Sequence, residues 1–268
     1  MTAKTYLTGL TSDLYISSDE DEGIKTSLET LKTRLNLYFG SGKINSHVIE
    51  DKYAFGSHTR DTMLPRKSDD DSDVDFLVIF EDAKGYYTQT CLNWLKDFAE
   101  YWYSTSIVKQ SLPTIVIELG KIKFELVPAY KESLGSIYIP SKDNNWIVTQ
   151  PNEFNSDLND ANKANNQQLK RTIRLLKHWN VNKNYRRLKS FMLEKELLNK
   201  LKYEYVSSSE LLDYVYSAFK GIRYYSSDEY IKGRIETAIE YIEKAIDYNK
   251  NGDGDMAVHY LKKVFPEV

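Results

Sequence analysis

The sequence predicts an α+β fold: a lobe built on a mixed sheet, then a lobe of helices, with an active site in the cleft between them. Two observations support this. Strand-like apolar segments and interspersed helical patterns fill the first half, and after a polar stretch at 140–166 only helical patterns follow. A chain of 268 residues is long enough for two lobes. We place the sheet lobe at 1–145 and the helical lobe at 146–268.

The first half alternates helices and strands. The apolar residues between 24 and 39 recur near helical spacing, and 74–80 (VDFLVIF) is an apolar run short enough for a buried strand. Gly120 and Lys121 leave room for a tight hairpin loop, and Pro128 is expected to end the strand after it. The predicted apolar stripe is Ile24, Leu28, Leu31, Leu35 and Leu37. The predicted elements are helices over 24–39 and 86–104 and strands over 46–53, 74–80, 114–119 and 122–127.

The second half is predicted to be helical. Prolines and many Asn and Asp residues mark 140–166 as a linker or a surface excursion. The helical patterns that follow cover 164–181, 189–202, 207–220, 228–249 and 255–264.

Composition narrows the class of protein. Thirty-six basic against 39 acidic residues give a net charge of −3, which argues against binding duplex nucleic acid by bulk positive charge but leaves room for a local phosphate site. The apolar runs are far shorter than the roughly 20 residues of a membrane span, so no membrane partner is expected. The first residues lack the apolar core of a signal peptide, and a single cysteine, Cys91, excludes an internal disulfide framework. We therefore expect a cytoplasmic protein.

Three acidic residues form the candidate centre. Asp73 and Asp75 lead into an apolar strand, and strand alternation puts both on one face. Glu125 interrupts an otherwise apolar strand, and a buried acid there calls for a cation. Carboxylates so placed can hold two divalent ions, which align an attacking hydroxyl with a leaving pyrophosphate. Most Asp-x-Asp pairs are solvated loop acids, the reading that we keep for Asp69, Asp70 and Asp71, and Glu118 is expected to be exposed.

A glycine–serine pair stands sixteen residues before the acids. Gly56 lets the backbone approach a ligand, and Ser57 can donate a hydrogen bond to a phosphate oxygen. Nearby Arg60 is a further phosphate-binding candidate, with a solvated surface arginine as the alternative.

These stretches resemble the polymerase-β-like nucleotidyltransferases, and within them the bacterial cGAS/DncV-like group (CD-NTases, SMODS type). The segments that carry the resemblance are YAFGSHTRDTMLPRKSDDDSDVDFLVIF (53–80), IELGKIKFELVPAY (117–130), RTIRLLKHWN (171–180), KSFMLEKELL (189–198) and AVHYLKKVF (257–265). The resemblance implies a catalytic first lobe and a nucleotide-binding second lobe.

The resemblance also implies roles for single residues. Asp73, Asp75 and Glu125 would bind two Mg²⁺ ions, with Mn²⁺ as a possible replacement. The implied substrate-binding residues are Gly56 and Ser57 at the donor triphosphate, Lys177 and Ser190 at its terminal phosphates, and Phe191 stacked on a base. For Lys177 an ordinary solvated helix lysine is the alternative. Two departures stand out: Asp61 replaces a glycine of many relatives, which bears on the loop over the phosphates, and Glu125 replaces an aspartate.

The implied activity joins NTPs, ATP and GTP among them, into a cyclic di- or oligonucleotide second messenger with release of pyrophosphate. Such products serve antiphage (CBASS) signalling through a downstream effector protein. Two alternatives stay open: a nucleotidyltransferase acting on RNA, an antibiotic or a protein, and a catalytically silent nucleotide-binding module.

Overall fold

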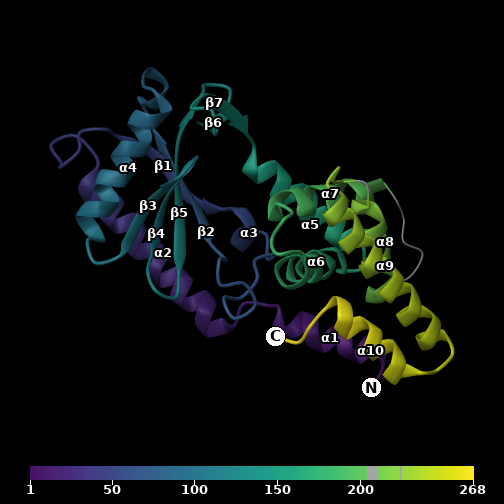
Figure 1. Ribbon diagram of the computed structural model, residues 1–268. Helices are drawn as coiled ribbons and strands as arrows, with labels where there is room; N and C mark the ends of the chain where they lie inside the picture. The colour runs from purple at the N-terminus through teal and green to yellow at the C-terminus, as the bar shows by residue number, and fades with distance from the viewer. Residues whose placement is uncertain (204–209, 224) are drawn as a thin grey trace. The chain divides into compact units, whose positions relative to one another are not determined.

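The computed structural model describes residues 1–203, 210–223 and 225–268, and Figure 1 shows their helices and strands. Contacts divide the chain into two compact units. The sheet unit comprises Ser17–Arg60 and Asp71–Asn155, and the helical unit comprises Met1–Ile16, Asp61–Asp70 and Ser156–Val268. The predicted α+β class is confirmed. The predicted functional lobes, 1–145 and 146–268, and the cleft between them stay a prediction.

The sheet unit contains a mixed sheet with helices packed on it. Its elements are α2 (Ser18–Tyr38), β1 (Ile49–Phe55), α3 (Gly56–Thr59), β2 (Val74–Phe80), the short 3-10 helix η1 (Ala83–Gly85), α4 (Thr88–Trp102), β3 (Ile107–Ser111), β4 (Thr114–Glu118), β5 (Lys123–Lys131), β6 (Ile137–Pro140) and β7 (Trp146–Thr149). The strand order is β1-β2-β5-β4-β3, with β6 paired to β5 and β7 to β6. Among the strand pairs of the described residues, β2 and β5 run parallel and the others antiparallel.

The two faces of the central strands serve different purposes. Phe80 packs its ring against Phe39, which follows α2, and against Trp94 of α4, so this face packs against the helices of the unit. Figure 1 shows α2 and α4 beside the sheet. On the opposite face Leu77 and Val127 belong to a small buried cluster. Because side chains alternate along a strand, Asp75 shares the face of Leu77. Asp75 and Glu125 therefore lie on the same face as this small cluster, near the N-terminal ends of β2 and β5.

Several predicted elements are confirmed. The strand at 74–80 coincides with β2, and the hairpin pairs β4 with β5 in antiparallel register, Val116 opposite Glu125. The prediction that Pro128 ends the second strand is wrong, because β5 continues to Lys131. The register with β4 ends at Leu126, so the missing N–H of Pro128 interrupts no ladder on that side. Strands β3, β6 and β7 were not predicted.

The first predicted helix is longer than expected. Helix α2 begins at Ser18, where Ser17 caps it by accepting a hydrogen bond from the Glu20 N–H at 3.2 Å. Of the predicted apolar stripe, Leu37 is wrong: it is exposed, and Tyr38 is buried in its place. The predicted helix at 86–104 is confirmed as α4.

The helical unit consists of α-helices. They are α1 (Ala3–Asp13), the greater part of α5 (Pro151–Ala164), α6 (Leu169–Asn184), α7 (Ser190–Tyr203), α8 (Leu211–Ile222), α9 (Glu229–Lys250) and α10 (Gly254–Val264). The interpretation of 140–166 as a linker is wrong, because β7 and α5 occupy most of it: Pro151 suits the first turn of a helix, and Leu158 is fully buried. Helix α1 was not predicted. Residues 207–209 of the predicted helix at 207–220 lie outside the described residues.

Candidate active site

The glycine–serine turn touches the second aspartate. Phe55, the last residue of β1, is the register partner of Asp75 on β2, and the next residue, Gly56, turns the chain with φ +78°. A Cβ added at Gly56 would lie 1.9 Å from Oδ2 of Asp75. Both the positive φ and this close approach require glycine. The turn thus holds the Asp75 carboxylate directly against backbone.

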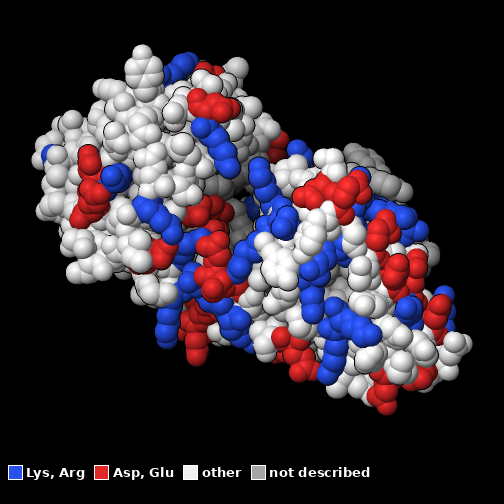
Figure 2. All heavy atoms as spheres, in the orientation of Figure 1, with Lys and Arg blue, Asp and Glu red and all other residues white. Residues whose placement is uncertain are grey.

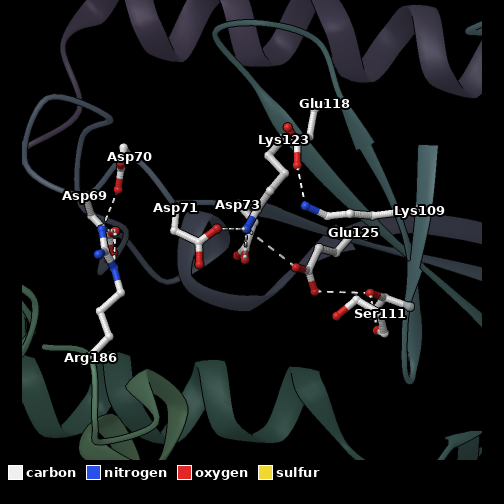
Figure 3. Close-up of polar contacts among 11 residues, drawn as sticks. Asp69, Asp70, Asp71, Asp73, Lys109, Ser111, Glu118, Lys123, Glu125 and Arg186 are labelled. Atoms are coloured by element: carbon white, nitrogen blue, oxygen red, sulfur yellow. Dashed lines mark hydrogen bonds and ion pairs between the residues drawn. The ribbon is translucent and has the colours of Figure 1, made fainter. Parts of the chain in front are cut away.

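The third acid joins the same site. Asp75 is the register partner of Glu125 on the parallel strand β5, so the two side chains lie on one face of adjacent strands. Lys123, two residues before Glu125, lies on that face as well. Its Nζ is 3.3 Å from Oδ2 of Asp73 and 3.7 Å from Oε1 of Glu125, and Figure 3 shows the ammonium between the carboxylates. The structure therefore brings Gly56, Asp73, Asp75 and Glu125 together, while their roles stay predictions.

Glu125 is the most perturbed acid of the site. Burial raises its pKa to about 7, and the charge of Asp73 adds to the rise, while Lys123 opposes it. Its Oε2 accepts a hydrogen bond of 3.3 Å from the hydroxyl of Thr114 on β4. Two acids this close favour holding a proton or a cation between them.

Lys123 is the residue of this site that sequence reasoning missed. Burial by itself lowers the pKa of Lys123, but the hydrogen bond to Asp71 at 2.6 Å and the charges of Asp73 and Glu125 raise it above the usual value. The side chain is only 9% exposed. The available signal was its position: alternate residues of one strand share a face, so a lysine two residues before Glu125 must meet the same acids.

The other acidic residues considered in the sequence form ion pairs of their own. The predicted exposed loop is wrong for Asp69, which is largely buried and 2.7 Å from Nη2 of Arg186; Asp70 is exposed and pairs with the same nitrogen at 2.5 Å (Figure 3). Asp71 is 69% exposed and binds Lys123. Glu118, predicted to be exposed, is partly buried and pairs with Lys109 at 2.6 Å.

Arg60 lies at the end of α3 in the same unit. It is buried, and its guanidinium carbon lies 5.2 Å from the ring centre of Phe154. Ser57 follows Gly56 in that short helix and is partly exposed. Neither observation tests the predicted contacts with phosphate.

The remaining predicted residues belong to the helical unit. Lys177 of α6 is buried; its Nζ donates to the carbonyl of Thr62 at 3.0 Å and forms an ion pair with Glu194 of α7, which is fully buried. Ser190 opens α7 and is exposed, and Phe191 is 49% exposed. Their predicted contacts with phosphates and a base stay predictions.

The conformation of Asp61 is compatible with the glycine that the resemblance leads us to expect at this position. Asp61 adopts the left-handed conformation, with φ +56°, in which glycine is unstrained and aspartate is among the better-tolerated residues. Its carboxylate pairs with Lys170 at 2.9 Å, and its carbonyl accepts a hydrogen bond from Arg174. The loop at this point is therefore fixed to α6 within the helical unit.

The acids of the sheet unit fit a divalent cation. Carboxylate oxygens are the ligands that Mg²⁺ and Mn²⁺ prefer. Asp73 and Glu125 already gather around one cation, the ammonium of Lys123, and the Gly56 turn leaves Asp75 room that a Cβ would fill. Within the part of the chain that the structure describes, no group of three or more Asp, Glu, His or Cys side chains is positioned to bind one metal ion. The carboxylates of Asp73, Asp75 and Glu125 are therefore suitable ligands for a divalent cation. In this structure Asp73 and Glu125 are arranged around the ammonium of Lys123.

Comparison with known families identifies the class. The family model of the Second Messenger Oligonucleotide or Dinucleotide Synthetase domain (SMODS) matches residues 1–162, more than half of the chain. The chain belongs to this family, and it is a nucleotidyltransferase of the class that makes cyclic oligonucleotides. No curated protein matches the chain in sequence.

Solved structures of bacterial CD-NTases share the fold. CdnC of Escherichia coli MS115-1 with ATP has a TM-score of 0.71 at 16% identity, over 98% of this chain and 97% of that one. CdnG of Bradyrhizobium diazoefficiens in complex with GTP has a TM-score of 0.68 at 12% identity, over 96% and 97%. The cyclic AMP-GMP synthase DncV of Vibrio cholerae has 0.63 at 12%, over 80% and 68%. At these identities the likeness concerns the fold.

The distribution of charged side chains on the surface agrees with the nearly equal numbers of basic and acidic residues. On the face shown in Figure 2, basic and acidic side chains are interspersed over each unit. Across the described ranges, 1–203, 210–223 and 225–268, every helix is too short or too polar to cross a bilayer.

Proposed function

We propose that this nucleotidyltransferase is metal-dependent and joins NTPs, with release of pyrophosphate, into a cyclic di- or oligonucleotide. One observation supports the proposal: Phe55, Asp75 and Glu125 are register partners across three strands, so the turn at Gly56 and acids from two chain segments lie side by side. Nucleotidyl transfer needs such a site, in which an acceptor hydroxyl and a leaving pyrophosphate are held in line.

The acids supply the ligands and the proton acceptor. Asp73, Asp75 and Glu125 would hold two Mg²⁺ or Mn²⁺ ions, whose chemistry is to polarise the reacting oxygens and offset the charge that passes to pyrophosphate. The acceptor oxygen forms a bond to the α-phosphorus, and the bond from that phosphorus to pyrophosphate breaks. Asp75 and Glu125 are proposed to face the attacking hydroxyl, and Glu125 is proposed to accept its proton.

The phosphates and the base would be held by the other predicted residues. Gly56 packs against the Asp75 carboxylate, and Ser57 follows Gly56 in α3. Both are proposed to hold the donor triphosphate, with Arg60 nearby in the chain. Lys177, Ser190 and Phe191 of the helical unit are proposed to bind the terminal phosphates and to stack on a base. Because Lys177 is already paired with Glu194, phosphate binding would require this pair to open or to share the ammonium.

The acceptor is proposed to be a ribose hydroxyl of a second nucleotide, and a second transfer at the same site would close the ring. Members of the family that this chain resembles use such products in antiphage signalling. We propose the same role here, in the cytoplasm, with an effector protein that recognises the diffusible product. ATP and GTP are the first substrates to test, because CdnC was solved with ATP and CdnG in complex with GTP.

Mass spectrometry of the products tests the proposal. The protein is incubated with all four NTPs, singly and together, with Mg²⁺ or Mn²⁺, and the products are treated with phosphatase. We expect pyrophosphate and a product whose mass and phosphatase resistance indicate a closed ring. Gly56→Ala, whose added Cβ would lie 1.9 Å from Oδ2 of Asp75, is expected to lose this product. Its matched control is Gly120→Ala on the β4–β5 hairpin loop, where no heavy atom lies within 4 Å of an added Cβ.

Other outcomes identify the alternatives. Product only when RNA, an aminoglycoside or a protein acceptor is added contradicts ring synthesis and indicates transfer to that acceptor. Tight NTP binding without any pyrophosphate contradicts the enzymatic proposal and indicates a nucleotide-binding module.

A further inference from the structure

Lys123 occupies an unusual position for a cation in a site built for divalent ions. It opens β5, its side chain is 9% exposed, and three carboxylates surround its Nζ: Asp71 at 2.6 Å, Asp73 at 3.3 Å and Glu125 at 3.7 Å. Figure 3 shows the ammonium in the middle of this group. Two of the three carboxylates, those of Asp73 and Glu125, are the ones that the proposed function assigns to metal.

An ammonium and a divalent ion cannot share these oxygens without cost. Two positive charges a few ångströms apart repel strongly, most of all where water is partly excluded. At the same time the acids need a cation, since a cluster of partly buried carboxylates repels itself. Lys123 meets that need in the metal-free protein, and by meeting it opposes the ion that the reaction requires.

The third carboxylate gives the ammonium somewhere to go. Asp71 precedes β2 and is 69% exposed, whereas Asp73 is 31% and Glu125 22% exposed. Of the three it is also nearest to Nζ. A lysine side chain is long and flexible, so a small rotation lets it keep Asp71 while leaving the two deeper acids.

We propose that Lys123 is a built-in competitor of the divalent cation: it bridges Asp73 and Glu125 in the metal-free protein and withdraws toward Asp71 when the ion binds. The inference rests on the proposed function, because it takes Asp73 and Glu125 as metal ligands. It adds a form of regulation to that site, because metal binding then depends on the position of the Lys123 ammonium.

Direct metal binding tests the proposal without any turnover. The probe is Mn²⁺ alone, titrated into the full chain, with the free ion measured by its electron paramagnetic resonance signal. Lys123→Met keeps the length and the apolar stem of the side chain but removes the charge; Lys123→Arg keeps the charge and is the matched control. We expect Lys123→Met to bind Mn²⁺ about tenfold more tightly or better, and Lys123→Arg to stay near the wild type. Equal or weaker binding by folded Lys123→Met overturns the proposal.

A second pair of variants keeps the test valid if Lys123→Met does not fold without metal. Asp71→Asn and Asp70→Asn each remove one exposed loop carboxylate, but only Asp71 contacts Lys123. We expect Asp71→Asn to weaken Mn²⁺ binding severalfold more than Asp70→Asn, because the ammonium then rests on the deeper acids. Equal effects of the two variants overturn the proposal.

The failure of this inference is distinguishable from failure of the proposed function. If Asp73→Asn with Asp75→Asn binds Mn²⁺ as the wild type does, the acids are not the metal site and both proposals fail. If that variant loses the ion while Lys123→Met binds it like the wild type, only the competition by Lys123 fails.

Discussion

Asp75 and Glu125 are register partners on the parallel strands β2 and β5, and Gly56 packs its backbone against the Asp75 carboxylate. A parallel neighbour brings the third acid to the first two from a segment some fifty residues away in the chain. The parallel pairing of β2 and β5 thus brings the candidate acids together.

Gly56 is expected to be irreplaceable. In Gly56→Ala the new Cβ would meet Asp75 Oδ2, so either the turn or the carboxylate must move. We expect turnover to fall about 100-fold or more, as displacements of about 1 Å at reacting groups do, with a loss in stability of about 1–3 kcal/mol. Gly120→Ala is the control, since φ is +73° there too but the space is open. Similar losses of turnover in both variants would show that backbone strain alone, and not the contact with Asp75, matters.

The stability of the metal-free protein is expected to fall between pH 5 and pH 8. The pKa of Glu125 is raised to about 7 in the folded state from 4.5, so folding favours its protonated form. This contribution is fully present below pH 4.5 and is lost as the pH rises through 7. Thermal unfolding in the presence of a chelator, at a series of pH values, measures it. The Tm of Glu125→Gln should decline less over that range, and parallel curves for both proteins would contradict the assignment.

The buried pair of Lys177 and Glu194 is expected to stabilise the helical unit. Removing one partner leaves the other charge uncompensated, so Glu194→Gln should lower the free energy of unfolding by about 3–5 kcal/mol. The exposed pair of Lys232 and Glu229 is the control, because Glu229 is 85% exposed and Glu229→Gln should change stability by less than about 1 kcal/mol. Chemical denaturation of both variants decides: a small, equal effect would mean that the buried pair contributes little.

The conformation of Asp61 makes a separate prediction. Both Asp61→Gly and Asp61→Ala lose the ion pair with Lys170, but only alanine has a Cβ at φ +56°. We expect the alanine variant to be less stable than the glycine variant by about 1 kcal/mol. Urea denaturation of the two proteins measures the difference, and an alanine variant as stable as the glycine variant would speak against a backbone requirement.

Local patterns predicted the site better than its surroundings. The run VDFLVIF is apolar and short, so β2 could be predicted to the residue, and Gly120 with Lys121 marked the hairpin that carries Glu125. That β2 and β5 are neighbours was a hypothesis drawn from the acid in an apolar strand, Glu125, and from the resemblance, since no local pattern encodes which strands pair in parallel.

The errors have physical causes. Helix α5 is polar and starts at a proline, so its composition resembled a linker until Leu158 was seen to be buried. Pro128 continues a strand because the ladder with β4 has already ended. Lys123 was overlooked because a lysine is expected in water. Strand alternation placed it on the face of Glu125, and the tertiary structure adds Asp71 and Asp73 around its ammonium.

The most direct test of the account is pyrophosphate release by Asp73→Asn with Asp75→Asn, measured with Mg²⁺ and all four NTPs beside the Tm of the same protein. The account predicts a loss of turnover of at least about 1,000-fold, with a Tm close to that of the wild type, since both acids lie at the partly exposed start of β2 and form no part of the core. Turnover within about tenfold of the wild type would contradict it, because the acids would then not carry the reaction.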